Sequence, residues 1–437
     1  MISQDNPEPT PGESPSPAPL HPLSETNHPP SASSNHHDDS PAINTSDNSP
    51  LPKLTPAELR RPNWPLRLVW TFIVAIYLFY VVLLPELQIA WHHYRRPNKL
   101  LPSTLQHDLV TRSILRSLEA LVVAFFFAVG ASIGSFLNVV AYRLPNNLDI
   151  SVAGSRCPKC GKRLNWKENM PLFGWLGLRG QCSGCHAPIS IKYLIAELLV
   201  GGLAVWIGSY ELLSGGINLP IRTPNFYAGA VWIIFYTKWD LVSYALFHFA
   251  FFAILATQLL ILHNGFSIPK RFLIFALTLG ITTSLFFPWL LPLHSAVFFP
   301  GIAVQASEQI VGVLPKYTQS SQTSVAYGIG FSCSLALLPA LWAWFISLPE
   351  NTDTSTSGTR KFADLWLWLA TFAYCGIWFG WQATIPIALV TLLVGSIYFT
   401  LSQSAAQRAF TLTALLLSVT ILHHTFWSWI VSFALRL

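Results

Sequence analysis

The chain has 437 residues, of which 52% are hydrophobic and only 11% are charged. Soluble proteins carry about 25% charged residues, so this composition excludes an ordinary soluble domain and indicates a membrane protein. The formal net charge of +6 is too small to indicate nucleic-acid binding; in a membrane protein, the position of each basic residue is more informative than the total.

The first part of the chain differs from the rest. Residues 1–63 are rich in Pro, Ser, Asn and Asp and offer few side chains that a core could bury. This composition predicts a disordered tail. It does not predict a signal peptide, because the first apolar run begins only at Trp64 and no Lys or Arg precedes Lys53.

Apolar runs follow at intervals along the remaining chain. A helix needs about 20 apolar residues to cross a bilayer. Nine runs approach that length, at 66–90, 116–142, 193–210, 241–263, 271–293, 325–348, 365–382, 384–402 and 410–432. They predict an all-α polytopic membrane protein with eight or nine transmembrane helices in a lipid bilayer. The apolar segment 225–237 is too short to span and is expected at the membrane interface.

The distribution of basic residues predicts the orientation. The loop 143–192 has a large excess of Lys and Arg over Asp and Glu, which places it in the cytoplasm. Alternation then places 264–270, 349–364 and 403–408 on the same side and 295–324 outside. The loop 91–115 disagrees, because it is expected outside yet holds several basic residues. Either the first run does not span or the rule fails there.

The loop 143–192 also contains two Cys-x-x-Cys pairs, Cys157 with Cys160 and Cys182 with Cys185. Pairs of this kind separated by about 20 residues are typical of zinc sites. The alternatives are disulfides, which a reducing cytoplasm disfavours, or four unrelated thiols. Four sulfur ligands close a tetrahedral shell and leave no open position. We therefore predict a structural zinc ion, with the neighbouring His186 not needed as a ligand.

The residues flanking this loop carry a family resemblance. The run GASIGSFLNVVAYRLP at Gly130–Pro145, the two Cys pairs, and CHAPISIKYLIAELLVG at Cys185–Gly201 follow one another in a specific order. This segment resembles the amino-terminal domain of type IV prepilin peptidases. The resemblance implies a polytopic enzyme of the bacterial inner membrane that removes the leader from prepilins and pseudopilins on the cytoplasmic face. It also implies N-methylation of the new terminus with S-adenosylmethionine.

The resemblance implies a division of the chain as well. An extra apolar helix and loop at 64–115 would precede the amino-terminal domain at 116–210, and a membrane-embedded, peptidase-like domain would occupy 225–437.

In the resembled family, cleavage depends on two membrane-embedded aspartates. The first falls near Leu255–Phe272 when the sequences are aligned on Ile268-Pro269. In this alignment the Asp-x-Asp positions become Leu262 and Asn264, and the Asp after Pro becomes Lys270. Aspartyl proteolysis needs one carboxylate to take a proton from water, and the amide of Asn264 cannot act as that base at neutral pH. The first acid position is therefore degenerate.

The best candidate for the second aspartate is Asp364, which follows a cytoplasmic loop and opens an apolar helix. The family's glycines before it are replaced by Lys361 and Ala363, and an ordinary first-turn acid explains Asp364 equally well. Two hypotheses remain. One is a working peptidase and methyltransferase. The other is a proteolytically inactive relative that binds leader peptides or assembly partners, with or without methylation.

Two further features have simple explanations. The matching first domain disfavours a generic transporter. The adjacent His423 and His424 of the last run point about 100° apart on a helix and would not chelate one ion well, so packing or contact with a lumen is favoured over a metal site.

Overall fold

A computed structural model describes residues 64–97, 99–102, 105–150, 155–157, 159–220, 229–291, 322–347, 357–399 and 405–434. The predicted tail at 1–63 lies outside them. The described residues form helices and connecting turns, with two isolated β-bridges and no longer strand. The predicted all-α class is confirmed.

The elements in chain order, with π- and 3₁₀-helices labelled η, are α2 (Trp64–Leu78), η1 (Phe79–Leu83), α3 (Leu84–Arg95), α4 (Leu109–Arg143), α5 (Phe173–Gly177), α6 (Lys192–Ile207), η3 (Gly208–Leu213), α7 (Ala230–Phe235), α8 (Trp239–His263), α9 (Lys270–Phe286), η4 (Pro288–Leu290), α11 (Gln322–Leu335), α12 (Leu337–Ser347), α13 (Ser357–Phe379), α14 (Trp381–Phe399), α15 (Ala405–Thr425) and α16 (Trp427–Ala434). Within the described residues, five helical segments are long and apolar enough to cross a membrane: Arg67–Arg95, Leu109–Arg143, Lys192–Leu213, Trp239–His263 and Val325–Phe345. The full number of spans stays a prediction.

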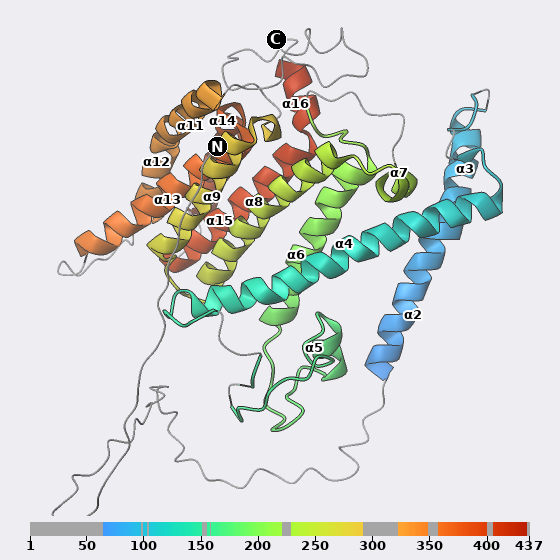
Figure 1. The fold of residues 1–437 in the computed structure, drawn as a ribbon, viewed down its shortest axis with the longest axis horizontal. Helices are drawn as coiled ribbons and strands as arrows, with labels where there is room; N and C mark the ends of the chain where they lie inside the picture. The colour runs from blue at the N-terminus through green and yellow to red at the C-terminus, as the bar shows by residue number, and fades with distance from the viewer. Residues whose placement is uncertain are drawn as a thin grey trace, which may run out of the picture. The chain divides into compact units, whose positions relative to one another are not determined.

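The helices α4 and α6 pack closely because glycines lie between them (Figure 1). Gly130 and Gly134 are four residues apart and therefore share one face of α4. A Cβ atom added to Gly130 would lie 2.5 Å from the Cβ of Ala204, and one added to Gly134 would lie 2.9 Å from the carbonyl oxygen of Ala196. This small-residue spacing lets two helix backbones approach in a membrane, where van der Waals packing supplies much of the association energy.

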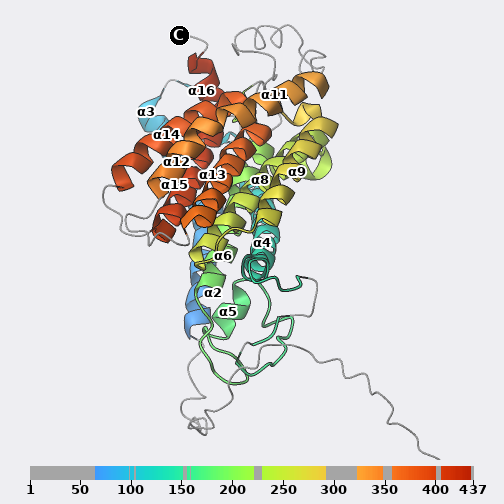
Figure 2. The same cartoon turned by 90° about the vertical axis from the view of Figure 1, so that its left-hand side faces the viewer.

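A second group of helices, α8, α9 and α11–α15, surrounds an aromatic core (Figures 1 and 2). α8 and α13 pack antiparallel. The rings of Phe247 and Trp378 stack with centroids 4.4 Å apart. Further along α8, Phe251 stacks on Tyr374 at 4.7 Å, and the amide of Gln258 donates a 3.0 Å hydrogen bond to Thr371. Residues further along α8 thus contact residues progressively earlier in α13.

The first apolar run forms one nearly continuous helical segment over α2, η1 and α3. Trp70, near its start, stacks on Phe173 of the four-cysteine loop with centroids 5.9 Å apart. The start of this run and the loop therefore lie at the same end of α4 and α6. Arg112, one of the basic residues that conflict with the predicted orientation, is buried and forms a 2.8 Å ion pair with Glu86.

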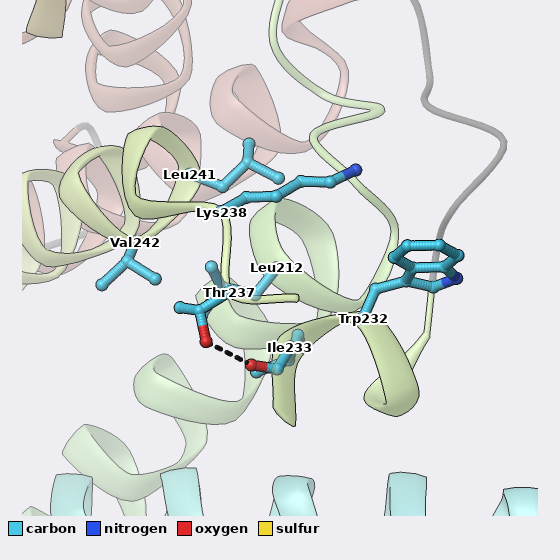
Figure 3. Close-up of a pocket in the computed structure, with 7 residues that line it drawn as sticks. All are labelled: Leu212, Trp232, Ile233, Thr237, Lys238, Leu241 and Val242. Carbon is cyan, nitrogen blue, oxygen red and sulfur yellow. Dashed lines mark hydrogen bonds between the residues drawn. The ribbon is translucent and has the colours of Figure 1, made fainter. Parts of the chain in front are cut away.

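The short helix α7 lies beside the ends of η3 and α8 (Figure 3). It covers less than two turns, Ala230–Phe235, as expected for a segment too short to span. Thr237 closes its last turn by donating a 2.9 Å hydrogen bond to the carbonyl of Ile233. Leu212 and Leu241 line the hollow between these elements, together with the polar side chains of Thr237 and Lys238.

Candidate functional site: a four-cysteine loop on a helix pair

The two Cys-x-x-Cys segments fold as matching turns. In the first turn, the N–H of Cys157 donates to the carbonyl of Lys162 and the N–H of Gly161 donates to that of Cys157, both at 2.9 Å. In the second, Cys182 and His186 repeat both bonds at the same spacing and the same 2.9 Å length. Gly161 and His186 hold equivalent positions with φ of 68° and 56°. The backbone of His186 therefore shapes the second turn.

The four sulfurs meet across the two turns. Cys157 Sγ lies 3.7 Å from Cys185 Sγ, and Cys160 Sγ lies 3.8 Å from Cys182 Sγ. All four lie within 4.8 Å of one another, and none of the described cysteines forms a disulfide. A tetrahedral shell with Zn–S bonds of about 2.3 Å separates its sulfurs by about 3.8 Å. The four cysteines therefore form a cluster that fits a metal ion such as zinc.

The protonation of these thiols also favours a cation. The backbone N–H of Cys160 is the main cause that lowers the pKa of Cys157, to about 6. For Cys185, the N–H of Ala187 acts in the same direction, but burial and the three other thiols outweigh it and raise the pKa to about 11. Four thiolates so close together repel one another. A divalent cation at their centre would allow all four to be deprotonated, with release of protons on binding.

Glu168 braces the two turns against each other. Its carboxylate accepts a 2.5 Å hydrogen bond from the hydroxyl of Ser183 in the second turn and a 2.9 Å bond from the N–H of Asn165. Lys162 of the first turn lies 3.5 Å from the same carboxylate and donates to Ser183 at 2.6 Å. The Ser183 hydroxyl is the main cause of the lowered pKa of Glu168, followed by the Asn165 N–H. A lowered pKa keeps the carboxylate ionised at neutral pH.

Replacing Glu168 with Gln is expected to weaken metal binding by the loop about tenfold. The change removes the charge that faces Lys162 and the strong acceptor of Ser183, and groups that orient metal ligands are worth about 10–100-fold in affinity. The affinity would be measured by competition with a zinc chelator. Lys167→Gln is the control, because Lys167 is exposed and lies next in sequence. Equal affinities for the Glu168 variant and the wild type would show that this brace has no effect on the metal site.

The loop is fixed to the helix pair by buried contacts. Glu197 of α6 is 7% exposed and accepts a 2.7 Å hydrogen bond from the N–H of Leu172. The indole N–H of Trp175 donates to the carbonyl of Ile189 at 3.1 Å. Gly174 is required by space, since an added Cβ would lie 2.2 Å from the carbonyl oxygen of Glu168. The bond to Glu197 therefore ties the loop to α6, while the other two contacts hold the shape of the loop itself.

The structure does not test the two predicted catalytic positions equally. Asn264 follows the last residue of α8 and is partly buried beside the end of α4, where Ile261 packs against Ala141. The backbone of Asp364 lies in α13, but its side chain is outside the described residues. Whether the two side chains meet stays a prediction. Glu168 and Leu172, which organise the loop, were not singled out by their spacing; their roles depend on the folded turns.

Comparisons with known proteins match the part of the chain that contains the four-cysteine loop. Residues 128–210 match the family described as "Bacterial Peptidase A24 N-terminal domain". A protein of Myxococcus xanthus is 51% identical over 81 residues, which are 18% of this chain and 24% of that protein. One from Dichelobacter nodosus is 40% identical over 100 residues, covering 17% and 35%. One from Vibrio cholerae is 37% identical over 112 residues, covering 22% and 44%.

Each of these three relatives is named "Prepilin leader peptidase/N-methyltransferase". The chain spans less than half the length of each of them. No solved structure matches the chain. The resemblance predicted from the residues between Gly130 and Gly201 is confirmed over that segment.

Proposed function

We propose that this chain, whose residues 128–210 belong to the prepilin peptidase family, processes the amino-terminal end of type IV prepilins or pseudopilins at the cytoplasmic face of a bacterial inner membrane. The reaction best supported by the described residues is methyl transfer to the amino terminus of the processed pilin, with S-adenosylmethionine as donor. The four-cysteine cluster carries this proposal, because it lies within the family-matching residues 128–210 and the relatives are named "Prepilin leader peptidase/N-methyltransferase".

The four-cysteine cluster has a structural role in the proposed function. Four sulfur ligands leave no open position on a zinc ion, so the metal would hold the loop in shape and would not bind the substrate. Exposed aromatic and basic side chains of the same loop, Trp166 and Lys167 among them, are available to contact a peptide. The loop is anchored to α6 through Glu197, at the end of the helices where the positive-inside rule predicts cytoplasm.

Leader removal is the second half of the proposed activity, and the helix register supports the predicted pair of positions. Gln258 of α8 contacts Thr371 of α13. Asn264 lies six residues beyond Gln258, and Asp364 lies seven residues before Thr371. Because the two helices are antiparallel, both positions are displaced toward the same end, by about 9 Å and about 10.5 Å at 1.5 Å per residue. Asn264 and Asp364 therefore lie at a similar depth along the two helices.

A second candidate function, a relative that does not cut, depends on one observation. Asn264 supplies an amide where the pair needs a carboxylate. The relatives' names favour an enzyme over a binding factor, but the family match covers residues 128–210 and does not include Asn264 or Asp364. The two candidates differ in whether wild-type protein removes a leader.

The test uses the full chain in detergent with a pseudopilin from the same cell, supplied with its leader or already cut. We expect the cut form to gain one methyl group when S-adenosylmethionine is present, and the uncut form to lose its leader in a reaction that Asp364→Asn abolishes. Asn264→Asp restores a carboxylate pair, so it is expected to speed leader removal by at least about 100-fold, the lower range for a general base.

The outcomes separate the candidates. Methyl transfer without any leader removal, even in the Asn264→Asp variant, would leave only the non-cutting relative. Leader removal that survives Asp364→Asn would show that the predicted pair is wrong. Neither methyl transfer nor leader removal, with a substrate that a related enzyme from another bacterium does process, would overturn the proposed function.

A further inference from the structure

A second cluster of metal-ligating side chains lies among the helices, away from the four-cysteine loop. It consists of Glu211 in η3, His248 in α8 and His424 in α15, all of them 0% exposed. Glu211 Oε1 lies 2.5 Å from His248 Nδ1 and 2.7 Å from His424 Nε2. One potential ligand atom from each residue lies within 4.8 Å of the others. Three helical elements distant in sequence therefore meet at one carboxylate.

The cluster is only partly satisfied by these contacts. The second carboxylate oxygen of Glu211, the Nε2 atom of His248 and the side-chain oxygen of Asn218 are buried with no hydrogen-bond partner in the described structure. Asn218 is 1% exposed and belongs to the cluster, because its amide nitrogen lies 3.2 Å from His424 Nδ1. Buried polar atoms are nearly always paired. Two unpaired oxygens beside a His–Glu–His group indicate a missing electrophilic partner.

The walls of this site are aromatic, which makes the unpaired atoms more costly. The ring of His248 stacks on Phe379 with centroids 5.1 Å apart and planes 6° from parallel. The ring of His424 lies edge-on to Trp206 at 4.9 Å, and Trp427 is also fully buried beside both. An ionised carboxylate in such a place needs a positive partner. A divalent cation with two neutral imidazoles and one carboxylate satisfies this need.

We propose that Glu211, His248 and His424 form a second metal site that binds a borderline divalent transition-metal ion, with Zn²⁺ as the probe. Two imidazoles and a carboxylate are a ligand set that zinc prefers. Bonds of about 2.0–2.1 Å separate tetrahedral ligand atoms by about 3.3 Å. Seating the ion therefore widens the two contacts to Glu211 by less than about 1 Å. Glu211 would then bind the ion through both oxygens of its carboxylate.

Asn218 has a defined part in this proposal. A metal-bound imidazole usually donates its other ring N–H to an oxygen. With the ion on Nε2, the Nδ1–H of His424 needs an acceptor, and the orientation of an Asn amide is assigned from its hydrogen bonds. Rotation of the Asn218 amide would present its unpaired oxygen to Nδ1. It would give up the 3.3 Å contact between the amide nitrogen and the carbonyl of His424.

The site is structural rather than part of pilin processing. Asn264 lies sixteen residues beyond His248 along α8, about 24 Å away at 1.5 Å per residue. The hollow beside α7, at the nearer end of the helices, is lined by Leu212 and Leu241 together with Lys238 (Figure 3). The ion would tie η3, which continues the family-matching helix α6, to α8 and to α15 near the carboxyl end of the chain.

The test is the zinc content and zinc X-ray absorption of the full chain purified in detergent after growth with zinc. We expect two zinc ions per chain in the wild type, and one in a variant with all four loop cysteines changed to serine. The absorption spectrum of that variant is expected to show only nitrogen and oxygen neighbours at about 2.0–2.1 Å, without sulfur at about 2.3 Å. Adding His424→Gln to it is expected to remove the remaining ion.

His423→Gln is the matched control, because His423 is the adjacent residue and is also buried, yet it lies outside the cluster. It is expected to retain both ions. If the cysteine-free variant does not fold, the wild-type spectrum decides, since half of its zinc would lack sulfur and the average would be about two sulfurs per zinc. One zinc per chain with four sulfur neighbours would overturn the second site and leave the proposed function untouched.

Discussion

Replacing Cys157 and Cys160 together with serine is expected to remove one zinc ion per chain and to unfold the loop between α4 and α6. The four sulfurs are already spaced for a tetrahedral ion, at 3.7 and 3.8 Å within the two measured pairs. The loop has little apolar core of its own, so metal binding supplies much of its folding free energy. Structural zinc in small domains is worth about 10–16 kcal/mol of apparent binding energy.

The unfolding of the loop would be measured by limited proteolysis of the detergent-purified protein, and the metal by elemental analysis. The variant is expected to be cut between α4 and α6 at protease concentrations that leave the wild type intact, and to lose methyl transfer. Cys333→Ser is the control, since Cys333 is exposed on α11 and outside the cluster. A doubly substituted protein that keeps its zinc and its resistance to protease would contradict the structural role of the cluster.

Replacing Gly134 with Leu is expected to destabilise the whole first domain. A Cβ atom at this position would lie 2.9 Å from the carbonyl oxygen of Ala196, 3.0 Å from the Cβ of Val200 and 3.1 Å from the Cα of Glu197. Two of these three atoms are backbone, so a side-chain movement cannot make room. Overpacking of a rigid contact costs about 1–3 kcal/mol or more, and here the two helices must separate.

The same separation would move Glu197 away from Leu172 and release the zinc loop from α6. We therefore expect a lower temperature of thermal unfolding in detergent and a loop that proteases cut readily. Gly202→Leu is a closely matched control, because Gly202 lies on the partner helix α6 with nothing within 4 Å of an added Cβ. Equal unfolding temperatures for Gly134→Leu and Gly202→Leu would show that the close approach of α4 and α6 is unimportant.

The sequence was sufficient for the four-cysteine loop because the relevant information is local. Two Cys-x-x-Cys turns bring their own sulfurs together, whatever the rest of the chain does. Spacing alone did not reveal the brace by Glu168, which depends on Ser183 of the second turn folding back onto the first. The close packing of α4 against α6 could not be predicted either, since the glycines of GASIG indicate it only once α6 is known to be the partner helix.

The buried cluster of Glu211, His248 and His424 could not be predicted from any motif. His248 is 37 residues and His424 213 residues from Glu211 in the chain. For the adjacent His423 and His424, packing or lumen contact was expected rather than a metal site; His423 lies outside the cluster, whereas His424 is one of its members. That argument considered only neighbours on one helix. A polar signal was present, however, in Glu211 at the end of an apolar run, since an acid at membrane depth usually has a partner.

In the peptidase half, the sequence located the expected catalytic positions but did not decide whether they are active. Alignment on Ile268-Pro269 placed an amide, Asn264, where an acid was expected. The antiparallel register of α8 and α13 supports pairing this position with Asp364, but a register cannot turn an amide into a base. Chemistry, and not the fold, therefore decides between a working peptidase and a relative that only methylates.

The most direct test of the account is the mass of the amino-terminal peptide of a leader-free pseudopilin after incubation with the full chain and S-adenosylmethionine. The proposed function predicts a gain of one methyl group with wild-type protein and with Cys333→Ser, and no gain with the Cys157→Ser, Cys160→Ser double variant. An unchanged mass with correctly folded, zinc-loaded wild-type protein would contradict the assignment of methyl transfer to this domain.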